Sequence, residues 1–230
     1  MDRVDIKSLI GSVVPNVPIM TLDMGTKCTL LCADCMRTGN RFNNVPPGGY
    51  GRDMTTSDFK KVLKYYDRFT FNGQLSDPIF NPHIETMFKM MVEAIPQDRM
   101  QLSSFHTAAT AKHLKEEYYV KLFKANPHIR WIFGLDGLPG ESQQYRKNQD
   151  SEFLFWIMTL AAEMGIPTTW QYIVFSFNEA SIFKAKQIAE RFDITLELVE
   201  TSRWNGEGDP RRPNKFKGKY LDWSFSNVKT

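Results

Sequence analysis

The chain has 230 residues, of which 42% are hydrophobic and 24% charged, a balance typical of folded globular proteins and unlike that of disordered ones. Its net charge of +3 is too small to require a nucleic-acid partner, and no apolar run reaches the roughly 18 residues of a membrane span. Residues 1–18 are read as an N-terminal extension that lacks the apolar stretch of a signal peptide, so we expect a cytoplasmic protein without a membrane partner.

Short apolar runs alternate with helical patterns from residue 19 onward. The runs that predict strands are Ile19–Met24, Phe69–Asn72, Met100–Ser104, Trp131–Asp136, Thr168–Phe175 and Thr195–Glu200. The patterns that predict helices are Thr55–Tyr66, Pro82–Ala94, Ala111–Ala125, Asp150–Met164 and Glu179–Phe192. Strands separated by such helices imply right-handed crossovers and a parallel sheet. Six units leave no room for eight, so the predicted fold is α/β, an open partial (β/α)6 TIM-like barrel over residues 19–204.

Polar and glycine residues follow each predicted strand. In parallel α/β folds the chemistry lies at the carboxyl ends of the strands, where these residues would meet on one rim. We therefore expect the functional site on this rim.

The three cysteines of the chain are Cys28, Cys32 and Cys35, spaced Cys-x3-Cys-x2-Cys just after the first predicted strand. Such an odd and clustered set is a poor disulfide framework and is more typical of metal or cluster ligands. Three thiolates can hold three irons of a [4Fe–4S] cluster and leave the fourth iron open, whereas a structural zinc ion takes four ligands. The candidates for a fourth ligand are His83, His106, His113 and His128. The spacing alone leaves a cluster, zinc and chance open.

This cysteine motif after the first strand of a partial barrel resembles the radical SAM superfamily, over roughly residues 18–203. The resemblance implies that Cys28, Cys32 and Cys35 bind one [4Fe–4S] cluster, whose open iron chelates S-adenosylmethionine (SAM). It further implies that the reduced cluster cleaves SAM to methionine and a 5′-deoxyadenosyl radical, which abstracts hydrogen from a substrate. An external one-electron reductant of the flavodoxin or ferredoxin type is implied as a partner.

The resemblance also implies which residues bind SAM. The segment with Asn72, Gly73, Gln74 and Asp77 is similar to the Gly-Asn-x-Gly-Asp-Pro variant of some peptide-modifying members, which receives the SAM amino group. The competing interpretation of this segment is a plain turn. The other implied SAM contacts are Ser103 and Ser104 after strand three, Asp136 and Arg146 after strand four, and, at the ribose, Ser176 or Asn178 after strand five. Arg146 suits the SAM carboxylate because a guanidinium binds a carboxylate in a bidentate fork. Asp136 is also read as a loop cap, and Asn178 more readily as the N-cap of the helix that follows.

Residues 205–230 form a basic and aromatic tail. Its composition suits nucleic-acid binding, but we favour a solvated tail that wraps the barrel. No cysteine follows Cys35, which predicts a single cluster. The sequence does not specify the substrate, which is a peptide, a nucleotide or a small metabolite. The alternatives are a non-catalytic protein that holds zinc or a cluster structurally, and a nucleic-acid-binding protein that acts through its tail.

Overall fold

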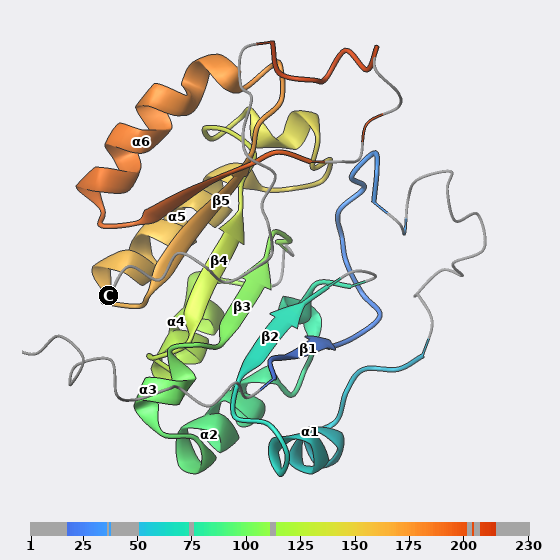
Figure 1. Ribbon diagram of the computed structural model, residues 1–230, viewed down its shortest axis with the longest axis vertical. Helices are drawn as coiled ribbons and strands as arrows, with labels where there is room; N and C mark the ends of the chain where they lie inside the picture. Colours follow the sequence, from blue (N-terminus) through green and yellow to red (C-terminus); the bar gives the residue numbers. More distant parts are fainter. Residues whose placement is uncertain are drawn as a thin grey trace, which may run out of the picture.

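The computed structural model describes residues 18–35, 37, 51–73, 76–110, 114–201, 204 and 208–214. Its strands form one six-stranded parallel sheet in the order in which they occur along the chain (Figure 1). They are β1 (Met20–Asp23), β2 (Phe69–Asn72), β3 (Ser104–Thr107), β4 (Arg130–Gly134), β5 (Thr168–Ile173) and β6 (Thr195–Val199). Within the described residues β1 and β6 are the two free edges, so the sheet is an open barrel and the predicted fold class is confirmed.

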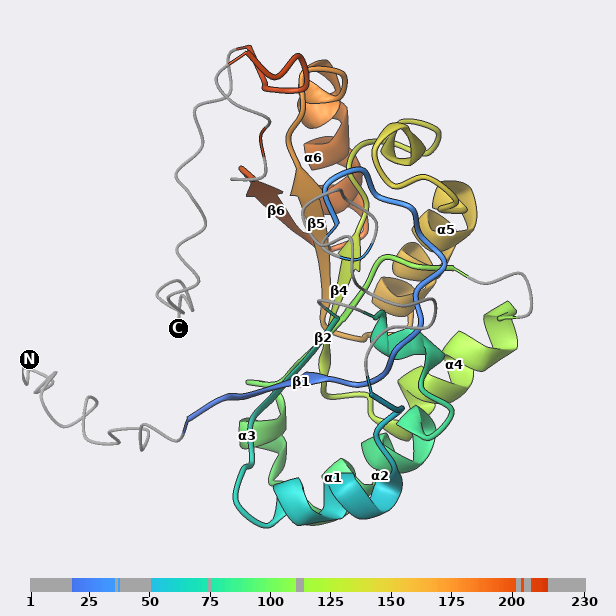
Figure 2. The same ribbon diagram turned by 90° about the vertical axis from the view of Figure 1, so that its right-hand side faces the viewer.

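Helices connect the strands as crossovers. They are α1 (Thr56–Leu63), α2 (Ile84–Ala94), α3 (Gln97–Met100), α4 (Glu116–Ala125), α5 (Ser151–Glu163) and α6 (Ile182–Arg191), with single 3-10 turns η3 (Pro78–Phe80), η4 (Ser142–Gln144) and η5 (Glu179–Ser181). Figure 2 shows α2, α4 and α5 gathered on one side of the sheet. None of the described helices is both long enough and apolar enough to cross a membrane.

Alternating side chains give the sheet two different faces. The face toward the helices, here called the outer face, carries a continuous aromatic core in which Phe105 lies 4.5 Å from Trp131 and 6.1 Å from Phe71, measured between ring centroids. The opposite face, here called the inner face, is mostly polar but also carries Ile132, Ile173 and Val199. Its polar side chains include Thr70 and Asn72 on β2, Ser104 and His106 on β3, Arg130 on β4, Gln171 on β5 and Glu197 on β6. The core therefore lies between sheet and helices, and the inner face is left for other contacts.

Local signals fix where two of the predicted helices begin. The hydroxyl of Thr55 accepts a hydrogen bond from the backbone N–H of Asp58, and the Asp58 carboxylate accepts from the backbone of Thr55, a capping box that starts α1. The Asp150 carboxylate accepts from the backbone N–H of Phe153 and starts α5. Both caps lie at the predicted starts.

The third strand is the main correction to the predicted elements. The sequence predicts it at Met100–Ser104. However, Met100 is the last residue of α3, a single helical turn that follows Pro96. The strand begins only at Ser104 and continues to Thr107. The predicted helix at Ala111–Ala125 begins at Glu116, and residues 111–113 lie outside the described part of the chain.

Candidate functional site

The cysteine loop follows β1 at the carboxyl end of the sheet, as predicted. Cys28, Cys32 and Cys35 are all described, and none of them forms a disulfide; Cys32 is buried and the other two are partly buried. Two backbone hydrogen bonds join the loop to distant segments, from Asp77 N to Lys27 O (2.8 Å) and from Leu31 N to Lys147 O (3.0 Å). The loop is thus held against the rim by the segments that follow β2 and β4.

Burial favours the protonated form of two of these thiols, Cys28 and Cys32, in the protein alone. It raises the pKa of Cys28 to about 12, an effect to which the nearby charge of Asp77 adds. It also raises the pKa of Cys32, although the positive charge of Arg146 acts in the opposite direction. Thiolates in such a setting are stable only when a metal or cluster binds them, so binding would release protons.

An iron–sulfur cluster and a structural zinc ion need different sets of ligands. Among the described residues, no three His, Cys, Asp or Glu side chains converge closely enough to hold a single metal ion. The thiolates of an iron–sulfur cube bind three different irons and therefore stand farther apart than the ligands of one zinc ion. The three cysteines are adjacent along one loop, where the charge of Cys32 adds to the raised pKa of Cys28 and the charge of Cys35 adds to the raised pKa of Cys32.

Asp77 connects the turn after β2 with the end of β3. Its carboxylate is fully buried and accepts four hydrogen bonds, from Ile79 N (3.1 Å), Thr107 Oγ1 (2.9 Å), Ala108 N (2.8 Å) and Ala109 N (2.9 Å). Burial raises the pKa of Asp77, and these hydrogen bonds counteract that rise. The carboxylate is saturated by the protein, so its geometry indicates a structural role rather than the SAM contact that the sequence suggests.

The turn after β2 depends on Gly73. A Cβ at this position would lie 1.8 Å from the carbonyl oxygen of Ser76, so no other residue fits the turn as it stands. Asn72 precedes it as the last residue of β2, partly exposed on the inner face. Gln74, the third residue of this predicted contact, lies outside the described residues.

Arg146 and Asp136 form a buried ion pair beside the cysteine loop. Arg146 Nη2 donates a hydrogen bond to Asp136 Oδ1 (3.1 Å), and Nε lies 2.7 Å from Oδ2 as an ion pair without hydrogen-bond geometry. Burial raises the pKa of Asp136, and Arg146 counteracts that rise. Gly134 makes room for this arginine, because a Cβ there would lie 3.1 Å from Nη2. The two residues predicted after β4 are therefore brought together, next to Cys32.

Ser103 and Ser104 require a correction, because they do not end the third strand. Ser103 precedes β3, is fully buried, and its hydroxyl accepts a hydrogen bond from the backbone N–H of Phe69 (3.0 Å). Ser104 is the first residue of β3 and contacts Thr70 and His106 on the inner face. Both serines lie at the amino end of the sheet, away from the cysteine loop, so the predicted SAM contacts are not supported. The wrong strand boundary caused the error.

Asn178 braces the ends of two strands instead of capping a helix. Its side-chain amide donates to the carbonyls of Asp136 and Ile173 (2.9 Å each), and its side-chain oxygen accepts from Phe175 N (2.7 Å). It makes no side-chain cap for the turn that follows, so the cap interpretation is wrong. Both amide donors are used within the protein, which disfavours the predicted ribose contact as well.

Ser176 holds a segment that sequence reasoning missed. Its hydroxyl donates to the carbonyl of Pro210 (2.8 Å) and its backbone N–H to the carbonyl of Arg211 (2.9 Å). Residues 208–214, here called the strap, are thereby attached to the end of β5. The predicted ribose contact at Ser176 is replaced in the structure by this attachment.

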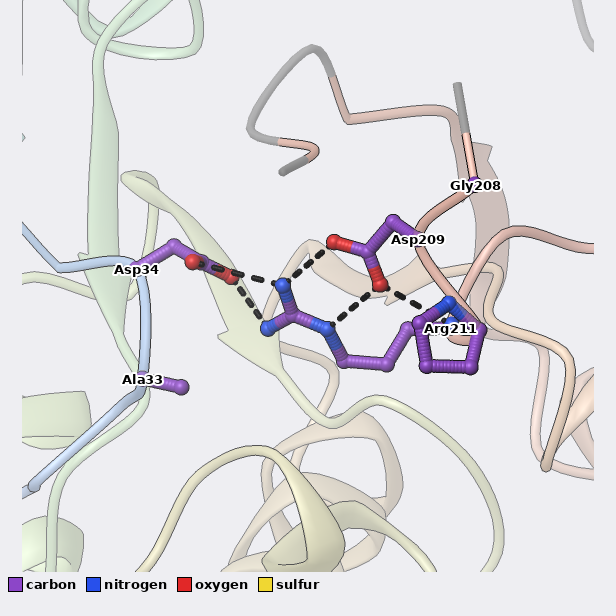
Figure 3. Close-up of a pocket in the computed structure, with 6 residues that line it drawn as sticks. Ala33, Asp34, Gly208, Asp209 and Arg211 are labelled. Atoms are coloured by element: carbon purple, nitrogen blue, oxygen red, sulfur yellow. Dashed lines mark hydrogen bonds and ion pairs between the residues drawn. The ribbon is translucent and has the colours of Figure 1, made fainter. Parts of the chain in front are cut away.

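The strap reaches back to the cysteine loop through Arg211. Figure 3 shows its guanidinium between Asp34, which lies between Cys32 and Cys35, and Asp209 of the strap itself. Nη1 is paired with Asp34 Oδ2, while Nε and Nη2 donate to Asp209 at 3.0 and 2.6 Å. The residues that line the pocket at this junction are Ala33, Asp34, Gly208, Asp209, Pro210 and Arg211. No local sequence signal links Arg211 to a loop near the start of the barrel.

Comparison with solved structures shows that the fold is shared with SuiB and anSMEcpe, both solved with S-adenosylmethionine (AdoMet) bound, and with TYW1. Streptococcus suis SuiB bound to S-adenosylmethionine matches with a TM-score of 0.60 and 12% identity, over 86% of this chain and 43% of SuiB. The enzyme anSMEcpe with bound AdoMet and Cp18Cys peptide matches with a TM-score of 0.56 and 16% identity, over 88% of this chain and 54% of that protein. TYW1 with a lysine-pyruvate adduct bound matches with a TM-score of 0.54 and 11% identity, over 80% of this chain and 66% of that protein.

At these identities the likeness establishes the fold alone. The chain spans about half of the length of SuiB and anSMEcpe. No protein-family model matches the sequence, and no curated protein matches it in sequence.

Proposed function

We propose that this chain is a radical SAM enzyme that holds one [4Fe–4S] cluster on Cys28, Cys32 and Cys35 and cleaves SAM reductively. The observation that carries the proposal is the place of the three thiols. They lie on one loop at the carboxyl end of β1, in a fold shared with SAM-bound enzymes. When bound, the cluster supplies one electron to SAM, which then yields methionine and a 5′-deoxyadenosyl radical.

The residues of the rim are assigned by the capacity that they have left for a ligand. Arg146 lies beside Cys32; its Nε and Nη2 are paired with Asp136, whereas its Nη1 makes no hydrogen bond or ion pair with a described residue. We assign it to the SAM carboxylate, with Asp136 holding the guanidinium in place. Asn72 and Gly73 are assigned to the SAM amino group, together with Gln74. Asp77 fixes the geometry of that turn.

Burial of the site serves the chemistry in two ways. Cys32 itself is buried, which limits the access of water to its side of the loop and helps to protect a reactive radical from side reactions. Burial also makes the free thiols poor ligands until protons are removed. Cluster assembly is therefore expected to proceed faster at alkaline pH.

A peptide is the first substrate class that we propose to test. SuiB is described bound to its precursor peptide SuiA, and anSMEcpe with the Cp18Cys peptide. TYW1 is described with a lysine-pyruvate adduct bound, so a small molecule is the second substrate class to test. We further propose a flavodoxin-type or ferredoxin-type reductant as the partner and a cytoplasmic location.

The test is anaerobic reconstitution with iron and sulfide, followed by dithionite and SAM and chromatographic assay of 5′-deoxyadenosine. We expect the product from the wild-type protein and loss of cluster absorbance in Cys32→Ala. Leu31→Ala is the matched control, because Leu31 lies in the same loop with 49% of its surface exposed and should leave loading unchanged.

A wild-type protein that loads the cluster but releases no 5′-deoxyadenosine would overturn the proposal. So would a Cys32→Ala protein that loads the cluster normally. In a loaded Arg146→Lys protein, we expect SAM binding to weaken by about 10-fold or more, since lysine loses the fork geometry.

A further inference from the structure

The inner face carries a cluster of polar side chains away from the rim. Arg130 opens β4 and is paired in register with Ser104, the first residue of β3. Because Trp131 faces the buried aromatic core, the alternation of the strand places the Arg130 side chain on the inner face. His106 lies on the same face, with its Nε2 3.1 Å from Ser104 Oγ.

Arg130 has a cationic group that no described residue pairs with. Its Nε is buried without a hydrogen bond, and it forms no ion pair with any described carboxylate. Arg146, in contrast, is paired with Asp136. Arg130 as a residue is half-buried, but taking its Nε out of water is unfavourable unless a partner replaces the water, so this unpaired nitrogen marks a position for an anion.

The neighbouring groups leave this position open to an anion. Burial, with the positive charge of Arg130 as a second cause, lowers the pKa of His106 to about 4, so its ring is neutral near pH 7. Burial raises the pKa of Glu197 on β6, and the charge of Arg130 counteracts that rise. Glu197 is therefore close enough for the charge of Arg130 to affect its pKa, but the two side chains form no ion pair. Ser104 and His106 supply neutral hydrogen-bonding groups beside the cation.

We propose that Arg130, with Ser104 and His106, forms an oxyanion subsite for the substrate, which therefore carries a carboxylate or phosphate group. This proposal rests on the proposed function, because it needs a substrate inside the barrel. Arg130 is the first of five residues in β4, so its backbone lies about 13 Å along the strand from the end that faces the rim. The anionic group would therefore be held at a distance from the reacting C–H bond and would orient it.

The test measures anion binding without turnover, on the cluster-loaded protein with SAM. Thermal unfolding is followed in sodium phosphate, in sodium acetate and in sodium chloride of equal ionic strength. At anion concentrations about ten times the dissociation constant, we expect phosphate or acetate to raise the melting temperature by roughly 3–6 °C above the chloride value. Arg130→Met should lose this rise.

Two further variants test whether the effect is specific to the guanidinium of Arg130. Arg191→Met removes the same charge from the exposed end of α6 and should keep the full rise. Arg130→Lys keeps the positive charge but lacks the bidentate geometry of the guanidinium, so it should lose at least half of the rise in melting temperature. This variant replaces Arg130→Met in the test if the methionine variant does not fold. A rise with phosphate alone identifies a phosphoryl group, and a rise with acetate alone identifies a carboxylate.

An equal rise in Arg130→Met, or no rise above chloride in the wild-type protein, would overturn the subsite. Failure of the proposed radical chemistry is seen separately, as absence of 5′-deoxyadenosine from the wild-type protein.

Discussion

Replacing Arg211 by alanine tests whether the strap holds the cysteine loop. The substitution removes the pairing with Asp34 of the loop and with Asp209 of the strap. It leaves the hydrogen bonds from Ser176 to the strap backbone in place. The expected effect is therefore a local release of the strap, without global unfolding.

The exposure of Arg211 and Asp34 determines how much their ion pair contributes to the free energy of local opening. The side chains of Arg211 and Asp34 are 24% and 16% exposed, so the pair is neither a surface contact of about 0.2–1 kcal/mol nor a fully buried one. Because the arginine binds two carboxylates, we expect the free energy of local opening to fall by about 1–2 kcal/mol, which is roughly a 5-fold to 30-fold larger open population.

Hydrogen exchange of single amides measures this directly. The backbone N–H of Ser176 donates to the carbonyl of Arg211 (2.9 Å), so its protection should fall by roughly 5-fold to 30-fold in Arg211→Ala. The backbone N–H of Trp131, which donates to Pro167 in the sheet (2.8 Å), is the internal reference and should not change. In the loaded protein, a chelator should then remove the cluster faster.

The neighbouring Arg212 provides the control. Its guanidinium lies 5.6 Å from the centre of the Trp204 ring and makes no ion pair with the described carboxylates. Arg212→Ala should leave the protection of Ser176 within about 2-fold. Unchanged protection in Arg211→Ala, or the same loss in both variants, would refute a clamp through Asp34.

Two predictions concern stability in denaturant. Gly73→Ala should lower the free energy of unfolding by about 3 kcal/mol, because its Cβ would meet the Ser76 carbonyl at 1.8 Å. Gly208→Ala, which meets no atom within 4 Å, should be neutral, and equal effects would contradict this reading. His106 has a folded-state pKa of about 4, below its unfolded value of 6.5, so the unfolded state binds more protons between these values. Stability should fall by on the order of 3 kcal/mol as the pH drops through that window, and His106→Gln should flatten this slope.

The fold was predictable because its signals are local. The alternation of apolar runs and helical patterns predicted five of the six strands at their observed places, and the cap residues Thr55 and Asp150 predicted two helix starts. The position of the third strand was predicted wrongly, for a physical reason. A short apolar run has no periodicity of its own, and the segment after Pro96 forms one helical turn before the strand begins at Ser104.

The site was predictable only as far as strand order determines it. The rule that polar residues meet at the carboxyl ends of parallel strands placed the cysteine loop and Arg146 correctly at one rim. The same rule says nothing about which partner each side chain takes. Arg211 pairs with a residue 177 positions away along the chain, and no property of either segment alone indicates that contact.

Hydrogen-bond saturation separates the residues that build the rim from those left for ligands. Asp77 accepts four hydrogen bonds, so Asp77→Ala should lower the free energy of unfolding by about 3–5 kcal/mol. The side chain of Asn72 is partly exposed and makes no hydrogen bond with the described residues. Asn72→Ala should therefore leave stability within about 0.5 kcal/mol and weaken SAM binding to the loaded protein by about 10-fold. Urea titration and equilibrium binding measure the two effects. If Asn72→Ala bound SAM normally while a folded Asp77→Asn protein lost SAM, the acidic residue would be the ligand of the amino group, and saturation would be the wrong criterion for this rim.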